Sequence, residues 1–374
     1  MKVALVHDWL RVNAGSEKVV HEMLYILRNE NPSLYTLFNK LNKKDSTLVL
    51  QGIKPHVSLL QYFPFIKLYY RYLLPVLPWF MQLIRPRHYD YYISSSHAVG
   101  KGFHVEKNKL HVCYCHTPMR YAWYLHNDYL KESSAIRKLL LRFVIPFIRN
   151  WDIKTSSRVD YFIANSKHIQ EQIKSIYNRD ATVIYPPVKV AKFALNSKPR
   201  QNYYLALGRF VSYKKMAIVI EAFRRMNDKK LVLIGDGYDD KEIRKLLAKS
   251  PNIIWLGYQD DDRLIEYMQY AKACIFAAKE DFGIMCVETQ ATGTPVLALR
   301  EGGYVETVQE GLSGYFFDQQ NAEEIISVVQ HFEENPLNNH EAIRASVLPF
   351  SDERFRSELK LFLDKAQLDY ASKR

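Results

Sequence analysis

Cysteine is scarce in this chain of 374 residues, and its four cysteines have no spacing typical of a disulfide framework or a zinc site. Cys113 and Cys115 share one predicted strand, so we interpret them as small apolar residues on one face of a sheet. We therefore expect structural thiols and no metal, which fits a reducing compartment. Met1-Lys2 leads directly into a short strand, so no secretion signal is visible and we expect a cytoplasmic protein.

Acidic residues are missing from one long window, between Asp45 and Asp90. The window is aromatic and apolar, and it carries prolines and basic residues: Pro64, Pro75, Pro78, Lys54, Lys67, Arg71, Arg85 and Arg87. Proline interruptions and the lack of a long apolar run argue against a membrane-spanning helix. Basic charge beside Trp, Tyr and Phe favours a segment, about residues 54–87, that lies on an anionic membrane surface. The alternative is a set of internal helices whose apolar sides pack in the core.

The overall composition is that of a folded protein with two domains. Hydrophobic residues make up 48% of the chain and charged residues 25%, over a length too great for one ordinary core. The formal net charge of +12 favours an anionic partner, such as nucleic acid, a membrane surface or a phosphorylated substrate. Tyr and Phe do not interleave with Lys and Arg in a nucleic-acid-binding motif, so we expect no nucleic-acid partner.

Strands alternate with helices along the chain, which predicts α/β structure with parallel sheets. Near the N-terminus, a strand at 3–6 is followed by a loop ending at Gly15 and by a periodic helix at 17–27, as in a doubly wound fold. The start of that helix is a candidate anion site, and Ser16 as a simple helix cap is the alternative. A later strand, 109–115, ends at His116, on the sheet edge where ligands bind in such folds.

A second α/β pattern begins after a polar, irregular stretch from Pro186 to about Gln201, which we interpret as the main linker. Its first strand, 203–207, leads to Gly208 and Arg209, with Lys214 five residues further on. Two cations at a strand end can hold a diphosphate and neutralise it as it leaves. Taken singly, each would be ordinary surface charge. Two α/β units joined by one linker predict a cleft between two domains.

Two carboxylates eight residues apart, Glu280 and Glu288, flank a turn between a buried strand and a helix. The turn contains Gly283, and its N–H groups together with the helix N-terminus can hold an anion. Carboxylates there can accept hydrogen bonds from ligand hydroxyls. The stretch is therefore a candidate site for a ligand with both phosphate and hydroxyl groups. The alternative is an ordinary turn with two solvated acids.

Together these motifs resemble the GT-B glycosyltransferases of family 4, which are retaining enzymes that use nucleotide sugars. The resemblance rests on Gly208-Arg209 with Lys214, Glu280-Asp281-Phe282-Gly283 with Glu288, Gly302-Gly303 with Glu306-Thr307, Gly15-Ser16-Glu17-Lys18, His116-Thr117-Pro118 and Asn165-Ser166. It covers nearly the whole chain and implies two Rossmann-like doubly wound domains facing a central cleft. The implied parts are an acceptor-binding domain at 1–187, a nucleotide-sugar-binding domain at 188–350, and a helix at 351–374 that packs back on the first domain.

The resemblance implies a role for each matching residue. Arg209 and Lys214 would bind the diphosphate, and His116 would contact the donor sugar near the reacting carbon. Glu280 would bind the sugar hydroxyls, and Glu288 the ribose hydroxyls. The remaining donor contacts would come from Gly15 in the first-domain loop, from Gly208, from Phe282, Gly283 and Ile284 beside sugar and phosphate, and from Gly257 and Tyr258 beside the base.

Two positions depart from the family pattern. Ala14 stands where a second glycine is common, which leaves the approach of that loop open. Lys215 stands where a glycine often follows the lysine, so either Lys214 or Lys215 would meet the phosphate, and the spacing favours Lys214.

The function implied is transfer of a hexose from a nucleotide sugar to a hydroxyl of a lipid-linked or polysaccharide acceptor. Segments 114–121 and 185–188 resemble the mannosyltransferase branch that builds bacterial surface polysaccharides such as lipopolysaccharide, which implies GDP-mannose as donor. The family is usually metal-independent, so we expect no metal or other cofactor, and a location on the inner face of the plasma membrane. The alternatives are another nucleotide-sugar enzyme of this fold, an epimerase or hydrolase, and a catalytically silent membrane scaffold of polysaccharide assembly.

Overall fold

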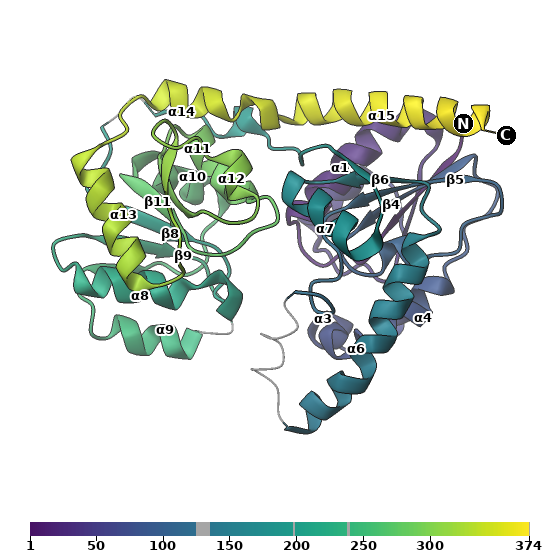
Figure 1. The fold of residues 1–374 in the computed structure, drawn as a ribbon, viewed down its shortest axis with the longest axis horizontal. Coiled ribbons are helices and arrows are strands. Elements are labelled where there is room, and N and C mark those ends of the chain that lie inside the picture. The colour runs from purple at the N-terminus through teal and green to yellow at the C-terminus, as the bar shows by residue number, and fades with distance from the viewer. Residues whose placement is uncertain (125–134, 197–198, 238–239, 374) are drawn as a thin grey trace. The chain divides into compact units, whose positions relative to one another are not determined.

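The structure is a computed structural model that describes residues 1–124, 135–196, 199–237 and 240–373. Contacts between residues divide the chain into two compact units: Met1–Pro187 with Glu353–Arg374, and Val188–Asp352. In both units a parallel β-sheet lies between layers of helices (Figure 1). The α/β class with two Rossmann-like domains, predicted from the sequence, is confirmed.

The described part of the first unit contains a seven-stranded parallel sheet in the order β3-β2-β1-β4-β5-β6-β7. The strands are β1 (Val3–His7), β2 (Ser33–Thr36), β3 (His56–Val57), β4 (Tyr91–Ser96), β5 (Leu110–Cys115), β6 (Tyr161–Ala164) and β7 (Ala181–Val183). The chain runs outward from β1 to β3 and then returns to place β4 on the other side of β1. The order therefore reverses between β1 and β4, and ligands bind at the carboxyl ends of strands at such a point.

Helices cover both faces of this sheet, because alternate strand residues point to opposite sides. Val3 and Leu5 of β1 pack in one core with α1 and the C-terminal helix. Ala4 and Val6 pack in a second core, with residues 60–84 and α6. The helices are α1 (Gly15–Leu27), η1 (Arg28–Glu30), α2 (Lys43–Leu50), η2 (Leu59–Tyr62), α3 (Ile66–Tyr69), η3 (Tyr70–Leu73), α4 (Leu77–Gln82), η4 (Gly100–Gly102), α6 (Ala135–Ser156), α7 (Lys167–Tyr177) and α15 (Asp352–Ser372).

The C-terminal helix α15 belongs to the first unit, although it follows the second unit in the sequence. Phe355, Leu359 and Leu363 recur every four residues, so they share one helix face, and all three are buried in the core with α1. The guanidinium of Arg356 donates to the buried carboxylate of Glu22 in α1 at 2.6 Å.

The described part of the second unit contains a six-stranded parallel sheet in the order β10-β9-β8-β11-β12-β13. Its strands are β8 (Tyr204–Leu207), β9 (Leu231–Ile234), β10 (Ile253–Trp255), β11 (Ala273–Phe276), β12 (Val296–Leu299) and β13 (Gly314–Phe317). Its helices are η5 (Val190–Lys192), η6 (Ser212–Lys214), α8 (Met216–Arg225), α9 (Asp240–Leu247), α10 (Asp261–Tyr270), α11 (Ile284–Ala291), α12 (Tyr304–Thr307), α13 (Ala322–Glu334), α14 (His340–Ser346) and η7 (Leu348–Phe350). Here the order reverses between β8 and β11.

The boundary between the units lies after Pro187, at the start of the predicted linker. This stretch packs on the second unit: Val188, Val190 and Phe193 are buried, and the Arg344 guanidinium donates to the carbonyl of Val190 at 3.0 Å. One local interpretation of the sequence is wrong: Ser16 is not a helix cap, because α1 begins at Gly15 and Ser16 lies inside its first turn.

Residues 54–87, interpreted from sequence as a membrane-surface segment or as internal helices, have one packed side and one exposed side. One side of the segment packs in the core, through Leu60, Ile66, Tyr70, Leu77 and Met81. The other side exposes large apolar residues: Leu59, Tyr62, Phe63, Phe65, Leu68, Tyr69, Tyr72, Val76, Trp79 and Leu83. In the described part of the chain, no helix combines the length and the apolar character needed to cross a bilayer.

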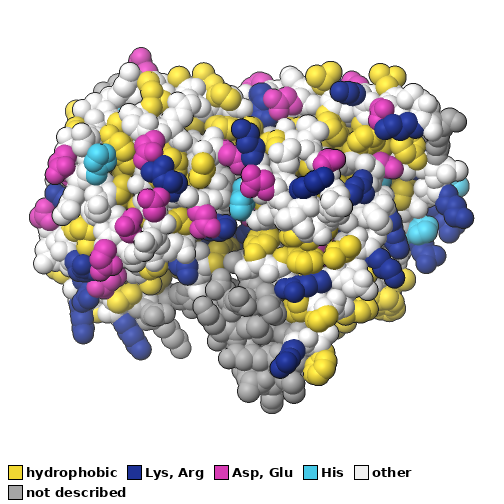
Figure 2. All heavy atoms as spheres, in the orientation of Figure 1, with side chains coloured by type: hydrophobic (Ala, Val, Ile, Leu, Met, Phe, Trp, Pro, Cys, Tyr) yellow, Lys and Arg dark blue, Asp and Glu magenta, His cyan; other side chains and the backbone are white. Residues whose placement is uncertain are grey.

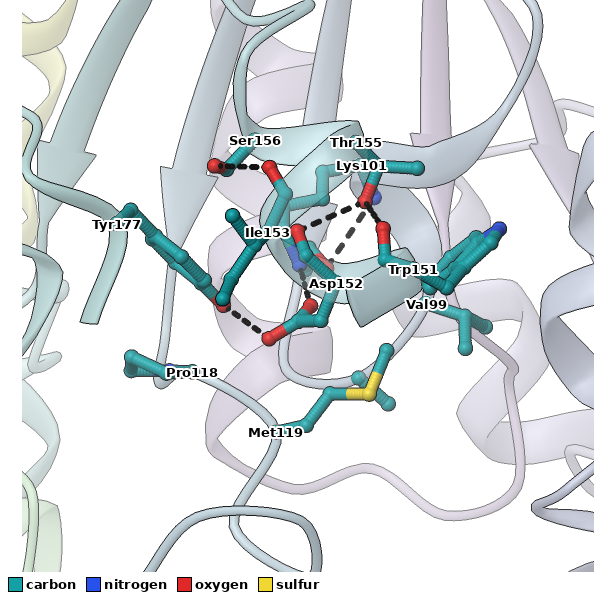
Figure 3. A network of polar contacts seen from close by, with 12 residues as sticks. Val99, Lys101, Pro118, Met119, Trp151, Asp152, Ile153, Thr155, Ser156 and Tyr177 are labelled. Carbon is teal, nitrogen blue, oxygen red and sulfur yellow. Dashed lines mark hydrogen bonds and ion pairs between the residues drawn. The ribbon is translucent and has the colours of Figure 1, made fainter. Parts of the chain in front are cut away.

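A buried ion pair joins three helices of the first unit (Figure 3). Lys101 of η4 contacts the carboxylate of Asp152 in α6, and both side chains are almost fully buried. The same carboxylate accepts from Tyr177 at the end of α7, at 2.7 Å, and from Trp123 Nε1, at 2.8 Å. Burial opposes the charged form of Lys101, but the charge and hydrogen bond of Asp152 leave the pKa of this lysine raised. Three donors thus satisfy one buried carboxylate.

We predict that Asp152→Ala destabilises the first unit strongly. The substitution leaves a buried ammonium without its partner, and breaking a buried pair in this way costs about 3–5 kcal/mol. Urea unfolding followed by tryptophan fluorescence measures it, because four of the five tryptophans, all except Trp255, lie in this unit. The control is Asp180→Ala, which removes the partner of Lys174 in an exposed pair and should leave the transition in place. Equal shifts for both variants would contradict the prediction.

Candidate functional site

In the second unit, the structure brings together two predicted residues that are 66 positions apart in the sequence. Lys214 follows β8 and Glu280 follows β11, and these two strands are neighbours where the strand order reverses. The Lys214 ammonium forms an ion pair with Glu280 Oε1, and the two side chains keep 21% and 15% of their surface exposed. The pair is therefore partly desolvated yet reachable by a ligand.

Two glycines after β12 allow the backbone of Glu280 to take its place. The N–H of Gly303 donates to the carbonyl of Glu280 at 2.8 Å, and Gly302 pairs with Glu280 in a parallel bridge. A Cβ atom on Gly302 would lie 2.2 Å from the carbonyl oxygen of Glu280, which no side chain tolerates. The glycine pair quoted in the family motif thus has a local physical reason: it admits the strand end that carries Glu280.

The turn after Glu280 leads into α11, which begins at Ile284. Gly283 precedes it with φ +88°, and a Cβ there would lie 2.6 Å from the Tyr304 ring. The first-turn N–H groups of α11 and its positive dipole end suit an anion. Glu288 lies one turn into α11 and is buried. The alternative of two solvated acids is therefore wrong.

Arg209 is linked to the Lys214–Glu280 pair through the side chain of Tyr213. It is exposed, and its Nη2 atom donates to the hydroxyl of Tyr213 at 3.0 Å. The Lys214 ammonium lies 5.7 Å from the centre of the same Tyr213 ring. The sequence interpretation missed Tyr213, although it lies inside the 209–214 motif. Lys215 has a left-handed φ of +57°, which explains why glycine suits its position in the family.

The predicted base site lies further along the same sheet edge. Gly257 and Tyr258 follow β10, which is separated from β8 by β9. The carbonyl of Gly257 accepts from Gly235 N at 2.9 Å, and the side chain of Tyr258 is 75% exposed. An exposed aromatic ring can stack on a base, as any flat π-system can.

The first unit carries the other predicted residues, and here the structure adds a cluster that the sequence interpretation missed. His7 ends β1 and is paired in register with Ser95 of β4. His7 Nδ1 lies 2.9 Å from the Ser95 carbonyl oxygen and 3.1 Å from Ser95 Oγ. His116 follows β5, and its Nε2 atom lies 2.8 Å from the same Oγ. The sequence indicates only that all three lie near carboxyl ends of strands; that these strands are neighbours comes from the sheet order.

Asp8, next to His7, fixes the turn after β4. Its carboxylate accepts the backbone N–H groups of His97, Ala98, Val99 and Gly100 at 2.6, 3.3, 2.5 and 2.6 Å. Four such bonds satisfy a fully buried carboxylate, and His97 Nδ1 lies 3.1 Å from Asp8 Oδ2. The turn is held rigidly, and His97 is held with it.

Three imidazole rings gather around this strand end. The centre of the His7 ring lies 5.6 Å from that of His97 and 6.4 Å from that of His116, and the last two are 6.3 Å apart. Burial lowers the pKa of all three, and that of His116 lies well below its ordinary value. Each ring would also repel a charge on the others. The lowered pKa values favour the neutral form of each ring.

Gly15 opens α1, and the loop before it is held by Glu17. Glu17 Oε2 accepts from the backbone N–H of Ala14 at 3.3 Å and from Ser16 Oγ at 2.8 Å. Burial raises the pKa of Glu17. How closely this loop approaches a ligand stays a prediction. Within the described residues, no group of three or more His, Cys, Asp or Glu side chains is placed to hold a metal ion.

The fold matches that of known proteins. HepE of Anabaena, solved in complex with UDP-glucose, superposes with a TM-score of 0.71 at 16% identity, over 98% of this chain and 100% of that one. At this identity the likeness concerns the fold alone, and it confirms the predicted GT-B architecture. The family model "Glycosyltransferase Family 4" matches residues 15–192, and "Glycosyl transferases group 1" matches residues 188–346. Each model matches less than half of the chain: residues 15–192 are similar to glycosyltransferase family 4 and residues 188–346 to the group 1 glycosyltransferases.

Curated relatives match only in part. An uncharacterised glycosyltransferase of Methanocaldococcus jannaschii is 31% identical over 169 residues, which is 44% of this chain and 47% of the relative. The α-1,3/1,6-mannosyltransferase ALG2 of Mus musculus is 22% identical over 247 residues, 56% of each chain. The chain thus spans about half the length of the curated relatives it matches.

We predict that Gly302→Ala lowers the free energy of unfolding by more than the strain of a left-handed backbone alone. Gly302 and Gly311 share a left-handed φ, +69° and +76°, but a Cβ on Gly311 meets nothing within 4 Å. Gly311→Ala should therefore cost about 1–2 kcal/mol of unfolding free energy, the penalty of that conformation alone. Gly302→Ala should cost a further ~1–3 kcal/mol, because the new atom pushes on the Glu280 carbonyl. Chemical denaturation of the two variants provides the comparison, and equal costs would contradict the close approach.

Proposed function

We propose that the protein is a retaining glycosyltransferase that moves a hexose from a nucleotide sugar to an acceptor hydroxyl. The Lys214–Glu280 pair at the switch point of the second unit carries this proposal. It sets a cation for a diphosphate beside a carboxylate for sugar hydroxyls, at the sheet edge where ligands bind in such folds. The matches to the two family models and the UDP-glucose complex of HepE support a nucleotide-sugar donor.

The two cations give the leaving group its stabilisation. Lys214 would contact the diphosphate directly, and Arg209, steadied by Tyr213, would reach it from solvent. Positive charge placed in advance where negative charge develops lowers the barrier without reorganisation. We propose that this charge replaces a metal ion. Glu280 pairs with the Lys214 ammonium and would bind the sugar hydroxyls.

Retention needs no protein nucleophile in this scheme. The glycosidic bond to the diphosphate breaks as the acceptor oxygen bonds to the same face of the sugar carbon. The acceptor proton passes to the leaving phosphate oxygen, so atoms and charge balance. Glu280 therefore differs from the nucleophilic carboxylate of retaining glycosidases. The buried Glu288 would accept the ribose hydroxyls.

GDP-mannose is the first donor to test, and a lipid-linked or polysaccharide glycan the first acceptor. The likeness of segments 114–121 and 185–188 to mannosyltransferases and the match to ALG2 support mannose. The UDP-glucose in HepE makes UDP-hexoses the second choice.

We predict that Lys214→Ala lowers kcat by roughly 10²–10³-fold, as the loss of one group that stabilises developing charge does elsewhere. Arg209→Ala should act in the same direction. Lys215→Gly is the matched control, because it removes the adjacent cation and relieves a left-handed backbone. Transfer is measured with GDP-mannose and UDP-hexoses, and binding by calorimetry with GDP and UDP. Unchanged rates in Lys214→Ala would refute the assignment.

Product analysis separates the alternatives. A glycosyltransferase gives a glycosylated acceptor, whereas hydrolysis or epimerisation proceeds without an acceptor. Failure of the wild-type chain to bind either nucleoside diphosphate would favour a silent scaffold.

We also propose that the first unit binds an anionic membrane through its basic aromatic face. We define this face as the exposed apolar residues between Leu59 and Leu83 with the exposed cations Lys54, Lys67, Arg85 and Arg87. Figure 2 shows hydrophobic and basic side chains side by side over the first unit. A monomer rarely exposes so much apolar surface unless something binds there. The absence of acids from 46 to 89 matches an anionic bilayer, with the protein peripheral on the inner face of the plasma membrane.

We predict salt-sensitive binding to vesicles that contain phosphatidylserine. A lysine near such a surface contributes about 1 kcal/mol, so Lys67→Glu should weaken binding severalfold. Trp79→Ser should weaken it by removing an interfacial anchor. Leu361→Ser is the control, since Leu361 is equally exposed but lies on α15. Co-sedimentation gives the partition coefficients, and equal partitioning onto neutral and anionic vesicles would contradict the electrostatic part.

A further inference from the structure

One hydroxyl in the first unit lies between two buried histidines. Ser95 Oγ is 3.1 Å from His7 Nδ1 and 2.8 Å from His116 Nε2. All three side chains are almost fully buried, and both rings are neutral because burial lowers their pKa. A neutral imidazole carries one proton, so each ring exists in one of two tautomers.

The backbone decides the tautomer of His7. Its Nδ1 atom lies 2.9 Å from the carbonyl oxygen of Ser95, and a carbonyl oxygen can only accept. His7 Nδ1 therefore carries the proton and shares it between the carbonyl and Ser95 Oγ. The other nitrogen, Nε2, is left bare, and it has no hydrogen-bond partner in the part of the chain that the structure describes.

The tautomer of His116 follows from that of His7. Ser95 Oγ accepts from His7 and has one proton of its own to donate. Among the described residues, the two histidines are its hydrogen-bond partners, so the proton goes to His116 Nε2. The reverse arrangement would leave a buried hydroxyl proton without an acceptor, which costs about 1–3 kcal/mol. His116 Nδ1 then carries the ring's own proton.

We propose that Ser95 and His7 are positioning residues that fix His116 as a neutral Nδ1–H donor for an oxygen of the sugar substrate. The identity of that ligand rests on the proposed function, whereas the tautomer does not. A neutral donor suits a hydroxyl oxygen and gives no charge preference for phosphate. The Ser95 bond also keeps the His116 ring from turning, because it holds one ring nitrogen. The backbone of His116 is held separately, since its N–H donates to Ser96 O at 2.9 Å.

The chain offers a matched control one residue away. Ser94 Oγ lies 2.9 Å from Nε2 of His111, so the neighbouring serine makes the same kind of buried bond. Ser94 precedes Ser95 in β4 and therefore points to the opposite face of the sheet. His111 lies near the start of β5, one strand length from the carboxyl edge, and packs on Phe103 with ring centres 4.9 Å apart. Ser94→Ala thus removes an equivalent bond away from the site.

The tautomer is tested directly on the full chain, without substrate. Nitrogen-15 NMR of histidine-labelled protein at pH 7.5 should give His116 a protonated Nδ1 and a bare Nε2. In Ser95→Ala that pattern should be lost for His116, while His7 keeps its protonated Nδ1 because its carbonyl partner remains. A protonated Nε2 on His116 in the wild type would overturn the proposal, whatever the activity.

Steady-state kinetics test whether the positioning of His116 contributes to sugar transfer. Residues that orient a metal-bound histidine typically contribute about 10–100-fold to activity. By analogy, Ser95→Ala should lower kcat at least about tenfold with little change in the KM of the donor. Ser94→Ala should lose a similar amount of stability and keep its kcat, and Ser95→Thr should recover most of the loss. Equal kcat losses in Ser95→Ala and Ser94→Ala would show that Ser95 has only a structural role and would contradict the proposal. Absence of transfer by the wild type would refute the proposed function and leave the NMR result standing.

Discussion

Parallel strand pairing is the constraint on which the candidate site depends. In each unit every paired strand runs in the same direction, so all polar strand ends lie on one edge of the sheet. The order of the strands then selects which ends are neighbours. Lys214 and Glu280 meet because β8 and β11 are adjacent, and His7 and Ser95 meet because β1 and β4 are adjacent. Distance along the sequence does not matter for either pair.

Much of the fold was predictable because parallel strands are buried on both faces. Segments such as 204–207 and 273–276 therefore read as short apolar runs, and the glycines and polar residues after them mark the sheet edge. The helix at 17–27 and the C-terminal helix were predicted for a similar reason, since their buried faces recur every three to four residues.

The side-chain partners could not be predicted from the sequence. Pairing of Lys214 with Glu280 requires the strand order, which local patterns do not determine. Ser95 and His7 escaped notice because each is a common residue at an ordinary strand end, and only the register places one beside the other. Residues 54–87 posed a different difficulty: apolar content predicts burial, but it does not tell which side of a short, proline-broken helix packs inside.

The two units offer a ligand different chemistry. The second unit presents charge that water reaches, because Lys214 keeps 21% of its side-chain surface exposed and Arg209 is exposed. The first unit presents groups that favour the neutral form, because burial lowers the pKa of His7, His97 and His116. A diphosphate needs cations, whereas a sugar hydroxyl needs a neutral donor held in one orientation. The proposed function uses both kinds of group, and the difference between the units follows from burial: Lys214 and Arg209 keep exposed surface, whereas His7 and His116 are buried.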